Sequence, residues 1–510
     1  MKKRVLSVIS FILVFSLLFS MFQRMFTQKW EGRYTRYEDF RNLKDEDIDV
    51  LAFGTSELWA AYDPIVTYHE LGITGYNFAV PFHSAVTAYY QLCQQLEYHT
   101  PKVVICDFCA LYEDNLPSES KSIEKLYCET LESLDNPTLK FRMIRDLLNI
   151  DKNISVISWL FPLIRYHSMW NQINGTTFEV DSSMKNEIVP YMKGAMLDSN
   201  YNADPLRYIT PENWNYEEEE NELSELSVKY YDKFIEKCHE KDIAVVALIP
   251  PDVDDSSLVA ARLSSEAAYF ASRDVYFLNY NTYEQYVRLN LNLERDYYDS
   301  MHLNTLGSVK FSKAFAKDLK SICILPDRRN DENVASTWNA LYDQFEVDML
   351  NSQPTIRHTV CLAKEFGYDV LAEIASDRLA LEETSFWSSE IKSLNREYGN
   401  DEELKSGYYC YDNSALELNY YEYDDEADEN VTETSLGVIT RKLNGDDYKY
   451  YYSIDGKELF SEFKAYYKHE IISPEFATKI IVLDKDKNVY AKSSWEYNNA
   501  NGNSRLLSRE

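Results

Sequence analysis

The sequence predicts an α/β protein with a parallel sheet, followed by a separate β-rich region. Short apolar runs at residues 50–53, 103–105 and 243–249 alternate with stretches whose apolar residues recur at helical spacing. Strands that alternate with helices are typical of a parallel sheet covered on both faces. Beyond about residue 326 the helical spacing fades, and tyrosine-rich segments alternate in period two. This change predicts a second structural unit.

Length and charge limit the classes of function. A chain of 510 residues can hold two domains, each with its own core. The net charge of −32 disfavours nucleic acid and an anionic membrane surface as partners, because both would repel the chain as a whole. Eight scattered cysteines include one close pair, Cys106 and Cys109, without a second pair at zinc spacing. Because this pair follows an apolar run, we expect a buried strand end there, and no metal.

The N-terminus has the pattern of a membrane anchor. Three basic residues at positions 2–4 precede an apolar run over 5–22, which is close to the minimum length for a membrane span. A cleaved signal peptide is the alternative, but Phe19, Met21 and Phe22 occupy the region where cleavage needs small residues. We therefore expect a transmembrane anchor over 1–29. The basic flank predicts a cytoplasmic N-terminus, with the bulk of the chain outside the cytoplasm.

The remaining chain divides into three parts. Residues 30–46 are charged and aromatic and are predicted to form a stalk. An α/β domain is expected over 47–325, interrupted by a helical, irregular insertion at about 115–225. A β-rich accessory module is expected over 335–510, with a hairpin at 479–491.

Two short segments carry the chemistry. Gly54-Thr55-Ser56 ends the first apolar run, and Asp299-Ser300-Met301-His302 lies far downstream in one loop. In an open parallel sheet both segments can reach the carboxyl edge, where a serine, a histidine and an aspartate form a nucleophilic triad. Each segment alone has an ordinary explanation, as a helix N-cap and as a surface pair. Their joint occurrence favours serine chemistry with Ser56, His302 and Asp299.

These two segments resemble the first and last sequence blocks of the SGNH (GDSL-type) hydrolases. Gly54-Thr55-Ser56-Glu57-Leu58 with the later Asp63-Pro64 is similar to membrane-anchored SGNH-like bacterial proteins that work beside membrane-bound O-acyltransferases, such as DltD. Further similar segments are 75–79, 101–105, 166–170 and 302–307. The resemblance covers about 47–325. It implies a three-layer, flavodoxin-like SGNH domain, with Ser56 as nucleophile, His302 as general base and Asp299 as its orienting acid.

The sequence departs from the family pattern at the oxyanion hole. Thr55 stands where the family has aspartate, no second-block glycine is evident at 79–82, and no Gly-x-Asn-Asp follows Ile105. Asn77 is a candidate oxyanion donor, or an asparagine satisfied by its own turn. Glu57 either tunes the site or occupies the favourable first turn of a helix. His167 either lines an acceptor site or packs on Trp170.

The resulting hypothesis is an extracytoplasmic, membrane-anchored serine O-acyltransferase or esterase that modifies a cell-envelope polysaccharide or teichoic-acid-like polymer. The resemblance implies a membrane-bound O-acyltransferase as partner, a single-pass protein of the cell membrane, and a bacterial, Gram-positive source. No cofactor is expected. Two alternatives stay open: a polysaccharide O-acetylesterase with water as acceptor, and a catalytically idle glycan-binding or scaffold protein.

Overall fold

A computed structural model describes residues 2–26, 33–43, 48–112, 114–154, 156–165, 192–201, 222–252, 265–374, 407–423, 427–446, 449–463, 478–498 and 503–509. The chain divides into two compact units. Unit 1 comprises 1–198 and 202–342, and unit 2 comprises 199–201 and 343–510.

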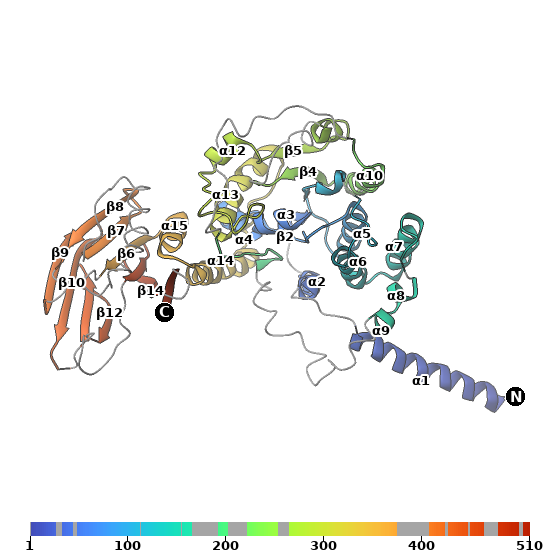
Figure 1. The fold of residues 1–510 in the computed structure, drawn as a ribbon, viewed down its shortest axis with the longest axis horizontal. Helices are drawn as coiled ribbons and strands as arrows, with labels where there is room; N and C mark the ends of the chain where they lie inside the picture. Colours follow the sequence, from blue (N-terminus) through green and yellow to red (C-terminus); the bar gives the residue numbers. More distant parts are fainter. Residues whose placement is uncertain are drawn as a thin grey trace. The chain divides into compact units, whose positions relative to one another are not determined.

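A five-stranded parallel sheet forms the centre of unit 1, as the alternating pattern predicts. Its strand order is β2-β1-β3-β4-β5, the 2-1-3-4-5 order of flavodoxin-like doubly wound sheets (Figure 1). β1 lies between β2 and β3, with Ala52 opposite both Asn77 and Ile105. The strands are β1 (Val50–Phe53), β2 (Gly75–Asn77), β3 (Val103–Cys106), β4 (Ala244–Ile249) and β5 (Tyr276–Asn279).

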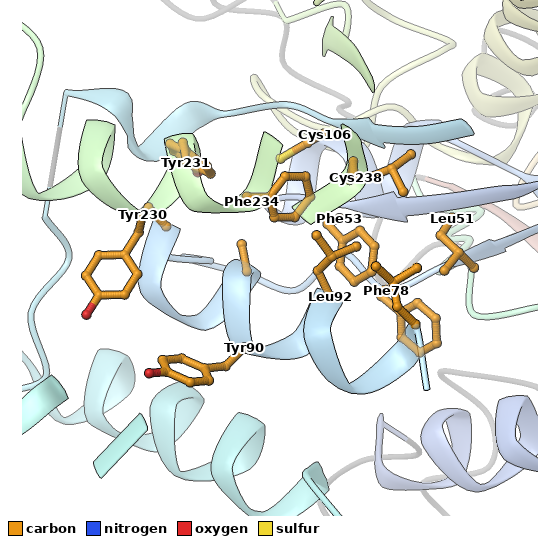
Figure 2. Close-up of a cluster of buried hydrophobic side chains, with 14 of the residues drawn as sticks. Leu51, Phe53, Phe78, Tyr90, Leu92, Cys106, Tyr230, Tyr231, Phe234 and Cys238 are labelled. Carbon is orange, nitrogen blue, oxygen red and sulfur yellow. The ribbon is translucent and has the colours of Figure 1, made fainter. Parts of the chain in front are cut away.

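Each face of this sheet is buried under helices. Leu51 and Phe53 belong to a core cluster on one face, where Figure 2 shows Phe53 beside Leu92 of α5 and Phe234 of α10. The intervening Val50 and Ala52 belong to a second cluster, which includes Phe311 of α13. This alternation follows from the period of two in a strand, and burial of both faces explains why β1 is apolar throughout. The helices that surround the sheet are α3 (Ser56–Ala61), α4 (Pro64–Leu71), α5 (Ala85–Gln95), α10 (Glu225–His239), α12 (Tyr283–Arg288) and α13 (Thr305–Ile322).

The N-terminal helix α1 (Lys2–Phe26) is long and apolar enough over 4–22 to cross a membrane. Residues 33–42, within the range predicted as a stalk, form helix α2 (Arg33–Asn42). Tyr37 and Phe40 of α2 are buried in the first core cluster, so this segment packs as part of unit 1.

The described part of the predicted insertion is helical between 121 and 165 and irregular at 192–201. Its helices are α6 (Lys121–Ser133), α7 (Pro137–Ile150), α8 (Val156–Leu160) and α9 (Pro162–Arg165). Short 3-10 helices occur at Cys109–Leu111 and Arg328–Asn330.

Unit 2 is rich in antiparallel sheet, as the period-two pattern predicts. A six-stranded sheet has the order β15-β14-β13-β6-β7-β8, and a four-stranded sheet has the order β12-β11-β10-β9. Leu371 and Tyr408 of the first sheet share a core with Ile439 and Ile454 of the second. The strands are β6 (Asp369–Ile374), β7 (Gly407–Asp412), β8 (Glu417–Glu422), β9 (Glu429–Thr434), β10 (Gly437–Asn444), β11 (Lys449–Ile454), β12 (Lys457–Phe463), β13 (Thr478–Leu483), β14 (Val489–Asn498) and β15 (Asn503–Arg509).

Two features of this region bear on the sequence prediction. The hairpin expected at 479–491 is confirmed by the antiparallel pairing of β13 and β14. Helical spacing, by contrast, continues further than expected, into α14 (Glu332–Ser352) and α15 (Ile356–Phe366). The physical reason is visible in α14, where Val334, Trp338 and Tyr342 recur every four residues and are buried.

Candidate functional site

Ser56 lies at the carboxyl edge of the central sheet. β1 ends at Phe53, and α3 begins at Ser56, so the serine occupies the first turn of a helix. Thr55 is the N-cap residue, but its side chain makes no capping hydrogen bond to the helix. The Thr55 side chain therefore does not cap α3, which was the ordinary explanation for the Gly-Thr-Ser segment.

The loop that carries Asp299 and His302 is held in place by buried ionic contacts. Asp296, which is fully buried, pairs with Arg295 at 3.1 Å and with Lys310 of α13 at 2.9 Å. Asn304 caps α13 by accepting hydrogen bonds from the amides of Leu306 and Gly307. These contacts tie both ends of the loop to the rest of the domain.

The structure brings Ser56, His302 and Asp299 together in one chain of hydrogen bonds. His302 Nε2 lies 2.8 Å from Ser56 Oγ. On the other side of the ring, Nδ1 lies 2.9 and 2.8 Å from the two oxygens of Asp299. With Nδ1 donating to the carboxylate, Nε2 is free to accept the serine proton. This is the geometry that a serine nucleophile and its general base require.

Asp299 is held in its ionised form. Its partial burial by itself would raise its pKa, but hydrogen bonds from the His302 ring and from the amides of Met301 and His302 outweigh this effect. The pKa of Asp299 therefore lies below its ordinary value. An ionised Asp299 can orient the imidazole and stabilise the imidazolium that forms when Ser56 gives up its proton.

Tyr298 is a site residue that the motif analysis missed. Its ring stacks on the His302 ring, with centroids 5.1 Å apart and an interplanar angle of 8°. This contact covers one face of the imidazole and restricts its rotation. The only sequence signal is that Tyr298 precedes Asp299, which does not by itself indicate stacking.

Asp107 is a second site residue that no sequence motif indicated. It follows β3, the neighbour of β1, at the point where the strand order reverses and where doubly wound sheets bind ligands. Its Oδ2 accepts hydrogen bonds from the Thr55 amide at 2.6 Å and from the Thr55 hydroxyl at 2.8 Å. Burial raises the pKa of Asp107, and the hydrogen bonds from Thr55 and Cys109 offset part of this shift. An aspartate directly after an apolar strand was the available signal.

The backbone amides that follow β1 and β2 differ in whether the chain itself uses them. Thr55 donates its amide to Asp107, Ala79 donates to Asn77 and Val80 donates to Gly54. The amides of Ser56 and Phe82, by contrast, have no acceptor within the described part of the chain. Both follow the carboxyl ends of the adjacent strands β1 and β2.

Phe82 has an unusual backbone for a bulky residue, with φ of 52° in the left-handed region that glycine favours. Its ring is 57% exposed.

Asn77 is fully buried and serves the fold locally. Its Nδ2 lies 2.9 Å from the carbonyl oxygen of Tyr62 and within 3.5 Å of two further carbonyls in α3, while Oδ1 accepts the Ala79 amide. These contacts use both amide hydrogens. The Oδ1 contact is the predicted contact within its own turn, whereas Nδ2, the candidate oxyanion donor, is used by carbonyl oxygens at residues 58, 59 and 62.

The other two candidate residues have different outcomes. Glu57 lies in the first turn of α3, and the Cys109 thiol lies 3.8 Å from its carboxylate. Burial raises the pKa of Cys109, and the neighbouring charges of Asp107 and Glu57 raise it further, so the thiol stays protonated. His167 lies outside the described residues. Where the chain is described, no three His, Cys, Asp or Glu side chains gather as metal ligands.

Neither a known protein-family model nor a curated protein matches this chain.

Proposed function

We propose that the protein is a serine acyltransferase or esterase of the SGNH type, anchored in a membrane and acting on a cell-envelope polymer outside the cytoplasm. The observation that carries the proposal is the hydrogen-bonded chain from Ser56 through His302 to Asp299. Ser56 lies 243 positions before Asp299 in the chain, and folding brings the two segments together.

The fold is consistent with this class. The resemblance implies a flavodoxin-like sheet with the nucleophile after the first strand and the Asp/His pair before the last helix. The sheet has the 2-1-3-4-5 order, Ser56 follows β1, and the Asp299/His302 loop precedes α13.

The proposed reaction has two steps. In the first, Ser56 Oγ attacks the carbonyl carbon of an ester or thioester, and its proton passes to His302 Nε2. The C–O or C–S bond breaks, the leaving group takes the proton from His302, and an acyl-serine remains. In the second, a sugar or polyol hydroxyl attacks the acyl-serine, His302 accepts its proton and returns it to Ser56, and the ester of the acceptor is released.

The amides of Ser56 and Phe82 are the proposed donors to the oxyanion. Each follows the carboxyl end of one of two adjacent parallel strands, and neither is used elsewhere in the described chain. Preorganised donors of this kind contribute about 3–4 kcal/mol each to transition-state stabilisation. Phe82 with its positive φ would then take the place of the second-block glycine.

The apolar helix α1 favours transfer over hydrolysis. A membrane anchor would keep Ser56 beside a membrane enzyme that delivers acyl groups, which transfer requires and hydrolysis does not. We therefore propose a membrane-bound O-acyltransferase as partner and a cytoplasmic N-terminus, as the basic residues at 2–4 favour.

Labelling with a fluorophosphonate probe tests the central claim, because the probe reacts only with an activated serine. The full-length chain should be labelled, Ser56→Ala should not, and Ser300→Ala, an exposed serine of the Asp299 loop, should label like the wild type. Labelling that survives Ser56→Ala, or that is absent from the wild type, would contradict the proposal.

The acceptor can be identified separately. Protein that reacts with the fluorophosphonate probe is mixed with a thioester or ester donor, once with a polyol acceptor and once without it. Acylated acceptor is the expected product; free acid alone, unchanged by acceptor, would instead indicate hydrolysis.

A further inference from the structure

Helices α8 and α9 form an apolar hairpin on the surface of unit 1. Between Val156 and Ile164 the only polar side chain is Ser158. Ile157 is 57% exposed and Ile164 is 43% exposed. A water-facing hairpin of this composition is unusual, because polar residues normally cover such short helices.

The hairpin is fixed to the domain rather than loosely attached. Trp159 is buried, and the Arg165 guanidinium lies 2.6 Å from the Glu132 carboxylate in a pair that is nearly inaccessible to water. Arg165 also donates to the carbonyl oxygens of Ser158 and Trp159. The inner side is thus anchored, and the outward direction of Ile157 and Ile164 is a property of the fold.

The hairpin also touches the anchor helix. The ring of Phe161, between α8 and α9, packs edge-on against Phe19 of α1, with centroids 5.4 Å apart. Phe19 lies inside the apolar window that ends at Phe22, about 5 Å from its end at the helical rise per residue. If α1 crosses a membrane, the hairpin therefore lies at the depth where interfacial helices bury their apolar faces.

The neighbouring helix α7 adds an aromatic and basic surface. Phe141 is 64% exposed, and Arg142 and Arg145 are exposed on the same helix face. Arg145 pairs with Asp146 at 2.9 Å, so it would have to share its guanidinium between that carboxylate and a phosphate. Residues 137–165 contain five basic and two acidic side chains, a local net charge of +3 in a chain of −32. The repulsion expected from the whole-chain charge does not apply to this segment, since charges beyond about 10 Å are screened. Figure 1 shows α7, α8 and α9 following one another along the edge of unit 1 that α1 joins.

We propose that the α7–α9 surface, made of Phe141, Arg142, Arg145, Ile157 and Ile164, docks onto an anionic lipid bilayer beside the anchor. The apolar hairpin enters the interfacial region, and the two arginines of α7 contact the phosphates of the headgroups. A bilayer fits better than a protein partner because the surface is continuous with a lipid-length helix and combines apolar with basic side chains. The proposal rests on the proposed membrane location of α1, but not on the chemistry of Ser56. Docking at a second point would hold unit 1 in one orientation on the membrane.

The test uses the full-length chain in lipid nanodiscs, with an environment-sensitive dye on single introduced cysteines. Ile157→Cys reports on the hairpin, and Val287→Cys of α12 is the matched control, since both side chains are 57% exposed. Figure 1 shows α12 on the other side of unit 1 from α9. Phe11→Cys in α1 reports on the anchor, and the wild-type chain gives the background labelling of its own cysteines.

Nitroxide-labelled lipids should quench the dyes at positions 11 and 157 and leave position 287 unaffected. Quenching at 11 with equal, weak quenching at 157 and 287 would overturn the docking surface while keeping the anchor. No quenching at 11 would overturn the anchor and the proposal with it. If the dye at position 157 were protected from water in native membranes but not in pure lipid, the proposal would also be overturned, because a protein would then cover the surface. Fluorophosphonate labelling of the same sample reports on Ser56 separately.

Charge reversal distinguishes anionic docking from simple apolar contact. The double variant Arg142→Glu/Arg145→Glu should lower quenching at 157 in bilayers that contain phosphatidylglycerol, and less so in phosphatidylcholine alone. Each arginine near an anionic surface contributes about five-fold to partitioning, so the loss should be at least that large. Lys241→Glu, an exposed reversal after α10, should have no effect. Equal behaviour of the double variant and the wild type in both lipids would overturn the role of the arginines.

Discussion

The Asp107 carboxylate holds Thr55 by two hydrogen bonds, one from its amide at 2.6 Å and one from its hydroxyl at 2.8 Å. Thr55 immediately precedes Ser56, so β3 positions the nucleophile that β1 presents. The Thr55 hydroxyl ties the nucleophile turn to the adjacent strand.

Gly54→Ala should disable the site by separating the Asp107 carboxylate from Thr55. A Cβ on Gly54 would lie 2.5 Å from Asp107 Oδ2, closer than non-bonded atoms can approach. The carboxylate must move, which breaks or weakens its hydrogen bonds to Thr55 and frees the turn before Ser56 to shift. Displacements of about 1 Å in an active site cost on the order of 10²-fold in rate, and fluorophosphonate labelling should fall accordingly. Gly445→Ala, where nothing lies within 4 Å of the added carbon, is the control; equal labelling of the two variants would refute the contact.

Asp299→Asn should slow labelling of Ser56 by roughly 10³–10⁴-fold, because a neutral amide neither fixes the tautomer of His302 nor stabilises its protonated form. The measurement is the second-order rate of probe labelling, with thermal unfolding as a check on folding. Met301→Ala, in the same loop and 37% exposed, should label at nearly the wild-type rate. A similar fall in labelling rate in both variants would show that the substitutions disturb the loop, and that the Asp299 carboxylate has no specific role.

Phe82→Gly should be more stable than Phe82→Ala by about 1 kcal/mol. Both variants remove the ring, but only glycine adopts a φ of 52° without steric cost. The comparison is a thermal-shift measurement on the two full-length variants. An alanine variant as stable as the glycine variant would argue against the left-handed conformation.

The free energy of unfolding should fall as pH rises from about 4 to about 7, because the pKa of Asp63 differs between the unfolded and folded chain. This carboxyl caps α4 through Oδ1, and burial raises its pKa to about 7. In the unfolded chain the same group titrates near 4. Between these values the folded state binds the additional proton, so unfolding free energy decreases with pH by at most about 1.4 kcal/mol per unit.

Asp63→Asn separates this contribution from the other titrating groups. Asparagine keeps the acceptor for the Ile65 amide and cannot ionise, so its variant should lose less stability than the wild type between about pH 4 and pH 7. Thermal unfolding of both chains across this range is the measurement. Parallel curves would mean that Asp63 does not titrate there.

Local pattern was enough to predict several features of this protein. The apolar runs identified β1, β3 and β4, because strands buried on both faces must be apolar throughout. The apolar run also predicted α1, a helix long and apolar enough over 4–22 to cross a membrane. Ser56, Asp299 and His302 were also chosen from residue type and position alone.

Other features depended on contacts between distant segments. Asp107 and Tyr298 had no motif of their own, since their roles come from a neighbouring strand and from ring stacking. The left-handed backbone at Phe82 could not be predicted from the sequence, because the residue there is not glycine. Asn77 was ambiguous until its three carbonyl partners were known.

The candidate triad shows both kinds of information. Residue order alone places a serine after a buried strand and an aspartate three residues before a histidine. The 2.8 Å distance from Ser56 Oγ to His302 Nε2, and the hydrogen bonds by which Asp107 holds Thr55, depend on how distant segments pack. Periodicity and composition act over a few residues, whereas the packing of strands and helices sets distances between atoms that are hundreds of residues apart in the chain.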